Sequence, residues 1–226
     1  MSQLINIFLE PGKVFAELKE KPNFVVPTLV VMLMASLSIL LYHMNVDPDW
    51  FVANRDAAMA GQMSKAELAQ VTAFLPGARA SGYIGAGMIL VITPVMYAIL
   101  GLYYLLAGKI TGNPVGYVRA LSLVAWSAMP MILASVIALV GTYTSSPQTT
   151  FESLQMLSLD PLFVQLPADH DWSMFFKSFS LLNFWVLFLA ALGWKTWFRT
   201  GWGQAIAVAG FPWLLWFGTI ALFAAI

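Results

Sequence analysis

Two histidines with acidic neighbours are the residues best suited to chemistry in this sequence. His43 and His170 are the only histidines among the 226 residues. The carboxylates beside them are Asp47 and Asp49 near His43, and Asp169 and Asp171 near His170. Neutral imidazole and carboxylate together can bind zinc or manganese. We therefore hypothesise a divalent-metal or pH-sensing site formed by His43, His170, Asp47 and Asp169. The alternative is that these are ordinary solvated loop residues.

Little other chemistry is open to the chain. It has no cysteine, which excludes disulfides, thiolate metal sites and cysteine nucleophiles. The apolar stretches contain no paired carboxylates and no base beside a hydroxyl, so acid–base and nucleophilic catalysis lack their groups. The formal net charge is zero, which offers no basic surface to nucleic acid. We expect a protein that is not an enzyme, with no cofactor other than the hypothesised ion.

The composition places the chain in a membrane. Only 10% of the residues are charged and 60% are hydrophobic, whereas soluble domains carry about 25% charged residues. Crossing a bilayer takes about 20 apolar residues. Such stretches occupy residues 24–43, 82–107, 120–143, 178–198 and 203–226. We predict an all-α polytopic membrane protein whose single membrane domain, residues 1–226, is a five-helix transmembrane bundle.

Shorter helices are expected outside these spans. Pro11 suits the first position of a helix over residues 11–20. One face of that helix is apolar and is made by Val14, Phe15 and Leu18. This pattern predicts a short interfacial helix with its apolar side in the membrane surface; the alternative is a frayed tail. In the first outer loop, residues 47–61 and 64–75 carry helix start and stop signals. We expect these two helices to cover the outer mouth of the bundle.

The distribution of Lys and Arg orients the chain. With the N-terminus inside, the inner segments and span ends carry seven of the eleven Lys and Arg residues. The outer loops, residues 44–81 and 144–177, carry the other four. Cytoplasmic loops are enriched in these residues, so we predict a cytoplasmic N-terminus and a C-terminus outside. Residues 1–21 lack the pattern of a signal peptide.

Three spans contain a proline near mid-depth: Pro94, Pro130 and Pro212. A proline inside a helix frees the carbonyl four residues earlier, and in lipid that carbonyl needs a donor from the protein. Thr93 and Ser127 lie close to two of these prolines and can donate. The kinks either improve helix packing or frame a cavity or hinge. Asn183, the most polar residue within the spans, is expected to hydrogen-bond between helices.

The third span carries a resemblance to a known family. Its segment "VAWSAMPMILAS" resembles the central signature of the Yip family (Ypt/Rab-interacting membrane proteins), in which a small residue and an aromatic precede a proline. Ala125, Trp126 and Pro130 occupy those places. The segment "IFLEPGKVFAELKEKP" resembles the bacterial members' pattern before the first span. The resemblance implies a five-helix bundle with a cytoplasmic N-terminus. Trp126 and Ser127 would then fill and satisfy the break made by Pro130.

The family's eukaryotic members bind prenylated Rab GTPases, and they have a long cytoplasmic segment before the first span. This sequence has only a short stretch there, so we expect no Rab GTPase partner. It resembles a bacterial member, which implies a location in the inner (plasma) membrane.

Two functions remain in contention. The first is a scaffold or accessory factor that organises membrane proteins or lipids, with lipids and a membrane-protein partner or a second copy as partners. The alternative is a small transporter or channel for a neutral or lipidic solute through the proline-kinked centre of the bundle. A water-accessible path lined by Thr93, Ser127 and Asn183 would favour the transporter. A dry and close-packed centre would favour the scaffold.

Overall fold

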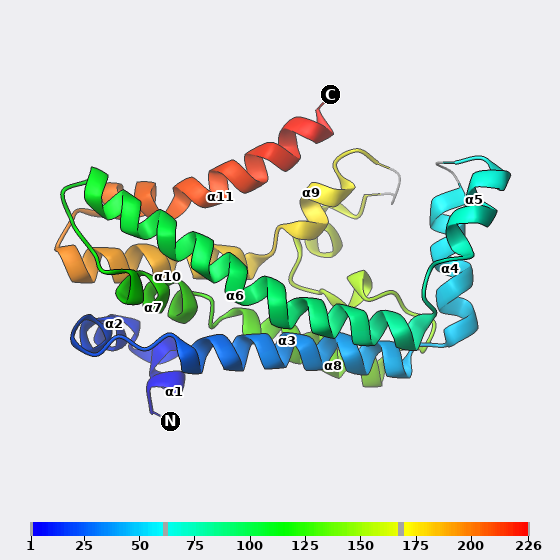
Figure 1. Cartoon of the computed structure of the whole chain (residues 1–226), viewed down its shortest axis with the longest axis horizontal. Helices are drawn as coiled ribbons and strands as arrows, with labels where there is room; N and C mark the ends of the chain where they lie inside the picture. Colours follow the sequence, from blue (N-terminus) through cyan, green and yellow to red (C-terminus); the bar gives the residue numbers. More distant parts are fainter. Residues whose placement is uncertain (1, 61–62, 167–169, 226) are drawn as a thin grey trace.

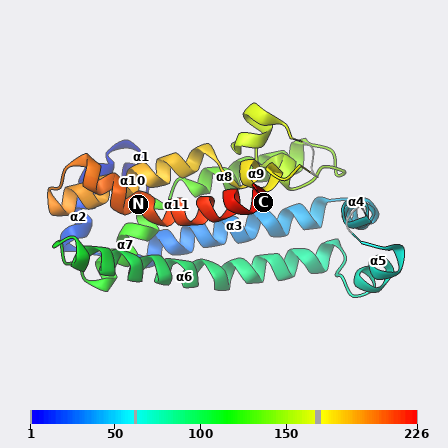
Figure 2. The ribbon, with the colours of Figure 1, turned by 90° about the horizontal axis from the view of Figure 1, so that it is seen from above.

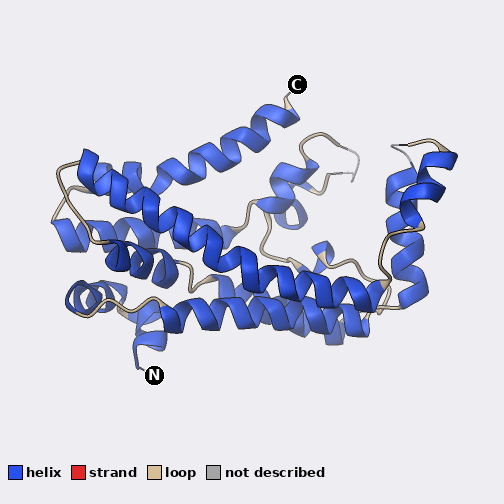
Figure 3. Ribbon diagram, viewed as in Figure 1, coloured by secondary structure: helices blue, strands red, loops and turns tan. Residues whose placement is uncertain are grey.

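The structure describes residues 2–60, 63–166 and 170–225, where the regular secondary structure of the computed structural model is helical and no strand forms. Five helical segments are long and apolar enough to cross a membrane, and they run along the long axis of the molecule (Figures 1 and 3). They are α3 (Val25–Asn45), α6 (Ala78–Ile110), the pair α7 (Tyr117–Ser127) and α8 (Met131–Thr144), α10 (Leu181–Phe198) and α11 (Trp202–Ala224). The prediction of an all-α, five-span membrane protein is confirmed.

Two spans differ in length from the sequence-based expectation. Helix α6 has 33 residues, which at 1.5 Å per residue is about 50 Å and exceeds the hydrocarbon core of about 30 Å. The fourth span was expected to start at residue 178, but α10 starts at Leu181 because the hydroxyl of Ser180 accepts the N–H of Leu182 at 3.3 Å. The short helix α9 (Ser173–Ser178) precedes this cap.

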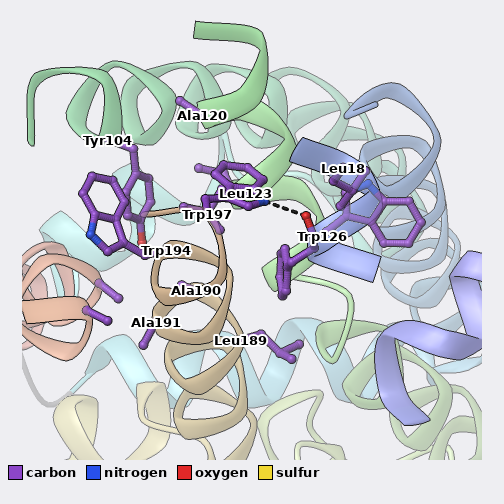
Figure 4. Close-up of a cluster of buried hydrophobic side chains, with 14 of the residues drawn as sticks. Leu18, Tyr104, Ala120, Leu123, Trp126, Leu189, Ala190, Ala191, Trp194 and Trp197 are labelled. Atoms are coloured by element: carbon purple, nitrogen blue, oxygen red, sulfur yellow. Dashed lines mark hydrogen bonds between the residues drawn. The ribbon is translucent and has the colours of Figure 1, made fainter. Parts of the chain in front are cut away.

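The main core forms where α7 and α10 meet (Figure 4). Helix α10 packs against α2, α7 and α11, while α3 packs against α6 and α8. The largest side chains that these contacts bury completely are Trp126 and Trp194. Because lipid tails are as apolar as the core, such packing stabilises the bundle mainly through close contact and hydrogen bonds.

The N-terminal segment forms α1 (Ser2–Leu9) and α2 (Pro11–Glu20). Helix α2 has the predicted bounds, but its apolar face lies on the protein and not on the membrane surface. Val14, Phe15 and Leu18 are at most 1% exposed. The indole N–H of Trp197 in α10 donates to the Phe15 carbonyl at 2.6 Å, and Lys19 Nζ donates to the Trp197 carbonyl at 2.7 Å. The end of α10 therefore provides the apolar surface that the sequence reasoning assigned to lipid.

Two further helices, α4 (Pro48–Ala60) and α5 (Lys65–Thr72), follow α3. The predicted capping box is present, since Ser64 accepts the N–H of Glu67 and Glu67 accepts the N–H of Ser64. No residue within α4 or α5 is buried. These helices run across the direction of the spans at the end of the bundle where α3 stops (Figures 1 and 2), and the expectation that they cover its mouth stays a prediction. Near the start of α4, Trp50 and Phe51 pack against the buried cluster that includes Tyr42 and Val46.

Candidate functional site: a cavity between the spans

The third span is broken at Pro130. Helix α7 ends at Ser127, residues 128–130 form a turn, and α8 begins at Met131. The Trp126 carbonyl, which Pro130 cannot serve, accepts the N–H of Met129 at 3.3 Å. The break lets α7 pack against α6 and α10 while α8 packs against α3. The span is therefore two helices joined by a tight turn.

The residues beside this break act differently from the expectation. Ser127 is 2% exposed, and its hydroxyl has no hydrogen-bond partner among the described residues, so it does not satisfy the break. The indole N–H of Trp126 donates to the Asn23 carbonyl at 2.6 Å, which ties α7 to the entry of α3. Ala125 and Pro130 are fully buried, in keeping with a packing role.

The other two prolines lie in continuous helices. At Pro212 in α11 the freed carbonyl is that of Val208, and it accepts the hydroxyl of Tyr103 in α6 at 2.6 Å. The Tyr103 ring also stacks on Phe211, with ring centroids 6.0 Å apart. Sequence reasoning missed Tyr103 because no local signal pairs it with α11. Pro94 is exposed within α6.

A cavity of about 470 Å³ lies between the spans. Three of the residues predicted from the sequence line it: Thr93 from α6, Ser127 from α7 and Pro212 from α11. Asn183 does not; it is buried in the first turn of α10. The volume falls within the range of small-molecule sites, about 300–1,000 Å³. Of the three prolines, Pro212 lines the cavity and Pro94 and Pro130 do not; that the kinks frame a cavity stays a prediction.

The cavity is apolar and lies within the depth of the spans. Its wall on α6 extends from Ile92 to Tyr104, and its wall on α11 from Pro212 to Trp216. None of the described residues that line it carries a charge. Thr93 and Ser127 are the aliphatic residues in this wall that carry a hydroxyl. Such a site can hold a hydrocarbon chain, and it lacks the acids or histidines that a proton relay requires.

The four residues of the hypothesised metal site are engaged in other contacts where the structure describes them. His43 is buried, its Nδ1 donates to the Ile39 carbonyl at 2.8 Å, and its ring packs edge-on against Phe51. His170 is exposed and accepts the N–H of Trp172 on Nδ1 at 3.2 Å. Asp169 lies outside the described residues. Among those described, no three His, Cys, Asp or Glu side chains gather to hold a metal, and the shared site stays a prediction.

Asp47 has a clear structural role at the start of α4. Its carboxylate accepts the N–H groups of Asp49 and Trp50, each at 3.0 Å, and the side-chain amide of Gln148 at 3.4 Å. The hydrogen bond from Trp50, followed by that from Gln148, lowers the pKa of this carboxyl below its ordinary value. The residue is a helix cap that also contacts the loop after α8.

These features define an all-α membrane protein of five spans with an apolar cavity at its centre. The Yip1 domain matches residues 5–224, and the chain belongs to that family. Comparison with curated proteins and with solved structures finds no match. The family resemblance drawn from the third span is confirmed.

Proposed function

We propose that this protein is a non-enzymatic accessory factor of the membrane that binds a lipid in its central cavity and so organises lipids or other membrane proteins around it. The cavity of about 470 Å³ carries this proposal. The described residues that line it carry no charge and are mostly apolar, and the surrounding membrane supplies hydrocarbon chains that match such a lining.

The arrangement of the helices supports lateral access for such an occupant. Helix α11 diverges from α6 towards its C-terminus (Figure 1), and both helices line the cavity. The described residues that line the cavity on these two helices carry no charge, which suits the entry of a lipid chain from the bilayer.

A small transporter or channel for a neutral or lipidic solute is the second candidate, because Thr93 and Ser127 both line the cavity as that hypothesis required. Asn183 is not part of the wall, so the path of polar groups expected for a transporter is incomplete. This favours holding a lipid over passing a solute. The proposal includes the cytoplasmic N-terminus and the bacterial inner membrane, with a membrane protein or a second copy as partner and no Rab GTPase or nucleic acid.

Extraction from native membranes without detergent, followed by mass spectrometry of lipids and proteins that accompany the chain, tests this function. Ala190 lines the cavity and is 3% exposed, so Ala190→Leu should fill space and reduce the retained lipid. Ala207 on α11 is exposed and does not line the cavity, which makes Ala207→Leu the matched control. Equal lipid retention by both variants, or no retained lipid in the unaltered protein, would reject the proposal.

A further inference from the structure

A second hollow lies between α10 and α11, apart from the central cavity. It measures about 360 Å³ and shares no lining residue with that cavity. Its walls are apolar: Phe184, Leu187, Phe188 and Ala191 from α10, and Trp202 and Ile206 from α11. Phe184, Phe188 and Ile206 are each about half exposed. In a membrane, this groove faces lipid along its length.

The turn between the two helices closes one end of the groove. Arg199 ends α10 in the left-handed conformation, with φ of 54°, and its N–H donates to the Lys195 carbonyl at 2.8 Å. Helix α11 then starts at Trp202, whose ring stacks on Phe188 with centroids 6.0 Å apart. Trp202 is thus both part of the groove wall and a residue of the turn, at the depth where tryptophan favours the membrane–water boundary.

A positive charge stands at this end. Lys195 Nζ lies 5.3 Å from the centroid of the Trp202 ring, a cation–π distance that holds the ammonium beside the groove. Within the described residues, the ion pairs are Lys13 with Glu10 and Arg55 with Asp56, so neither Lys195 nor the exposed Arg199 has a carboxylate partner there. The N-terminus of α11 adds partial positive charge at the same level.

We infer that this groove binds an anionic phospholipid, with an acyl chain along the apolar wall and the phosphate beside Lys195 and Arg199. Three features agree on one occupant: the groove is bordered by lipid, its lining is wholly apolar, and its end at the membrane boundary carries two cations. Each Lys or Arg near the membrane surface attracts anionic lipid by about 1 kcal/mol. On the proposed orientation the lipid belongs to the cytoplasmic leaflet.

Native mass spectrometry of the protein released from vesicles of equal phosphatidylglycerol and phosphatidylcholine tests the site. The unaltered protein should retain phosphatidylglycerol in preference. Lys195→Gln should reduce the retained phosphatidylglycerol about fivefold, whereas Lys195→Arg, which keeps the charge, should retain it. Lys109→Gln is the matched control, since Lys109 is an exposed cation at the same end of the bundle but on α6 (Figure 1).

The groove is tested separately from the charge. Ile206 is 50% exposed, so Ile206→Trp adds bulk in the groove without entering the core, and it should lower retention of phosphatidylglycerol. Ile99→Trp, at a position on α6 that is 55% exposed and outside both hollows, should have no effect. The inference is overturned if the protein shows no preference between the lipids, if Lys195→Gln and Lys109→Gln behave alike, or if Ile206→Trp retains as much phosphatidylglycerol as Ile99→Trp. Filling the central cavity with Ala190→Leu leaves this groove open, so the two proposals fail independently.

Discussion

At the scale of single residues, aromatic side chains donate to backbone carbonyls of other helices. The Asn23 carbonyl, just before the start of α3, accepts the indole N–H of Trp126. The Val208 carbonyl lies four residues before Pro212 and accepts the Tyr103 hydroxyl. Within a bilayer no water can take over these bonds. Each donor comes from a different span, so the same bond that satisfies a carbonyl also joins two helices.

Removing the Tyr103 hydroxyl should weaken the contact between α6 and α11. Tyr103→Phe keeps the ring that stacks on Phe211 and leaves the Val208 carbonyl unpaired, which should lower the free energy of unfolding by about 1 kcal/mol. Tyr143→Phe is the control, because Tyr143 is 62% exposed. Reversible unfolding in lipid bicelles measures both variants. Equal free energies of unfolding for Tyr103→Phe and Tyr143→Phe would show that this hydrogen bond does not stabilise the contact between α6 and α11.

The cap on α4 should respond to acid. The pKa of Asp47 is lowered in the folded protein, so its stabilising effect is complete above the ordinary carboxyl pKa of about 3.9 and is lost as the pH falls below that value. A nitroxide on the exposed residue Ala58 should become more mobile below about pH 4. Asp47→Asn, whose amide oxygen still caps the helix, should remove that pH dependence. If the nitroxide in the Asp47→Asn protein gains mobility at the same pH as in the unaltered protein, another group is responsible for the transition.

Only part of this residue-level picture was open to prediction. The sequence suggested the hydroxyls of Thr93 and Ser127 as donors near Pro94 and Pro130. At Pro212, the freed Val208 carbonyl accepts the hydroxyl of Tyr103, which lies more than 100 positions away along the chain. A contact between distant segments leaves no periodic or local signal. A cavity was one of the two outcomes expected from the prolines. Their position near the middle of apolar stretches could be read from the sequence, and a proline there can bend a helix away from its neighbour.

At the scale of elements, the close fit of α2 onto α10 rests on a glycine. A Cβ on Gly193 would collide with Leu123 and would lie 2.9 Å from Phe15 Cδ1. Hydrophobic length predicted the five spans well, and Pro130 indicated the break in the third span, but neither showed that α2 packs inward. That packing depends on a neighbouring surface, which a single stretch of sequence does not describe.

Adding a methyl group at Gly193 should therefore displace α2. Gly193→Ala is expected to destabilise the fold by about 1–3 kcal/mol and to expose the segment around Phe15 to hydrogen exchange. Gly210→Ala is the matched control in the adjoining span, where the nearest atom to a new Cβ is 3.8 Å away, and it should be tolerated. Unchanged exchange in α2 of the Gly193→Ala protein would contradict the packing described here.

At the scale of the whole molecule, the two ends of the bundle differ in charge. The end that contains α2 and the turn between α10 and α11 carries cations without ion pairs in the described residues, among them Lys195 and Arg199. The opposite end carries α4 and α5, which lie beyond the end of α3 (Figure 2). Cytoplasmic loops are the ones enriched in Lys and Arg. On the predicted orientation, the same asymmetry places the proposed groove for anionic lipid on the inner side.

Accessibility of single cysteines should reveal that orientation, because the chain has no native cysteine to interfere. Ala66 in α5, Ser146 after α8 and Gly116 before α7 are all exposed, and a Cβ on Gly116 meets no atom within 4 Å. Ala66→Cys and Ser146→Cys should react with a membrane-impermeant maleimide in intact spheroplasts, and Gly116→Cys should react only after the membrane is opened. The reverse pattern would place the N-terminus outside. It would also move the proposed phospholipid groove to the outer leaflet, since Lys195 and Gly116 lie at the same end of the bundle (Figure 1).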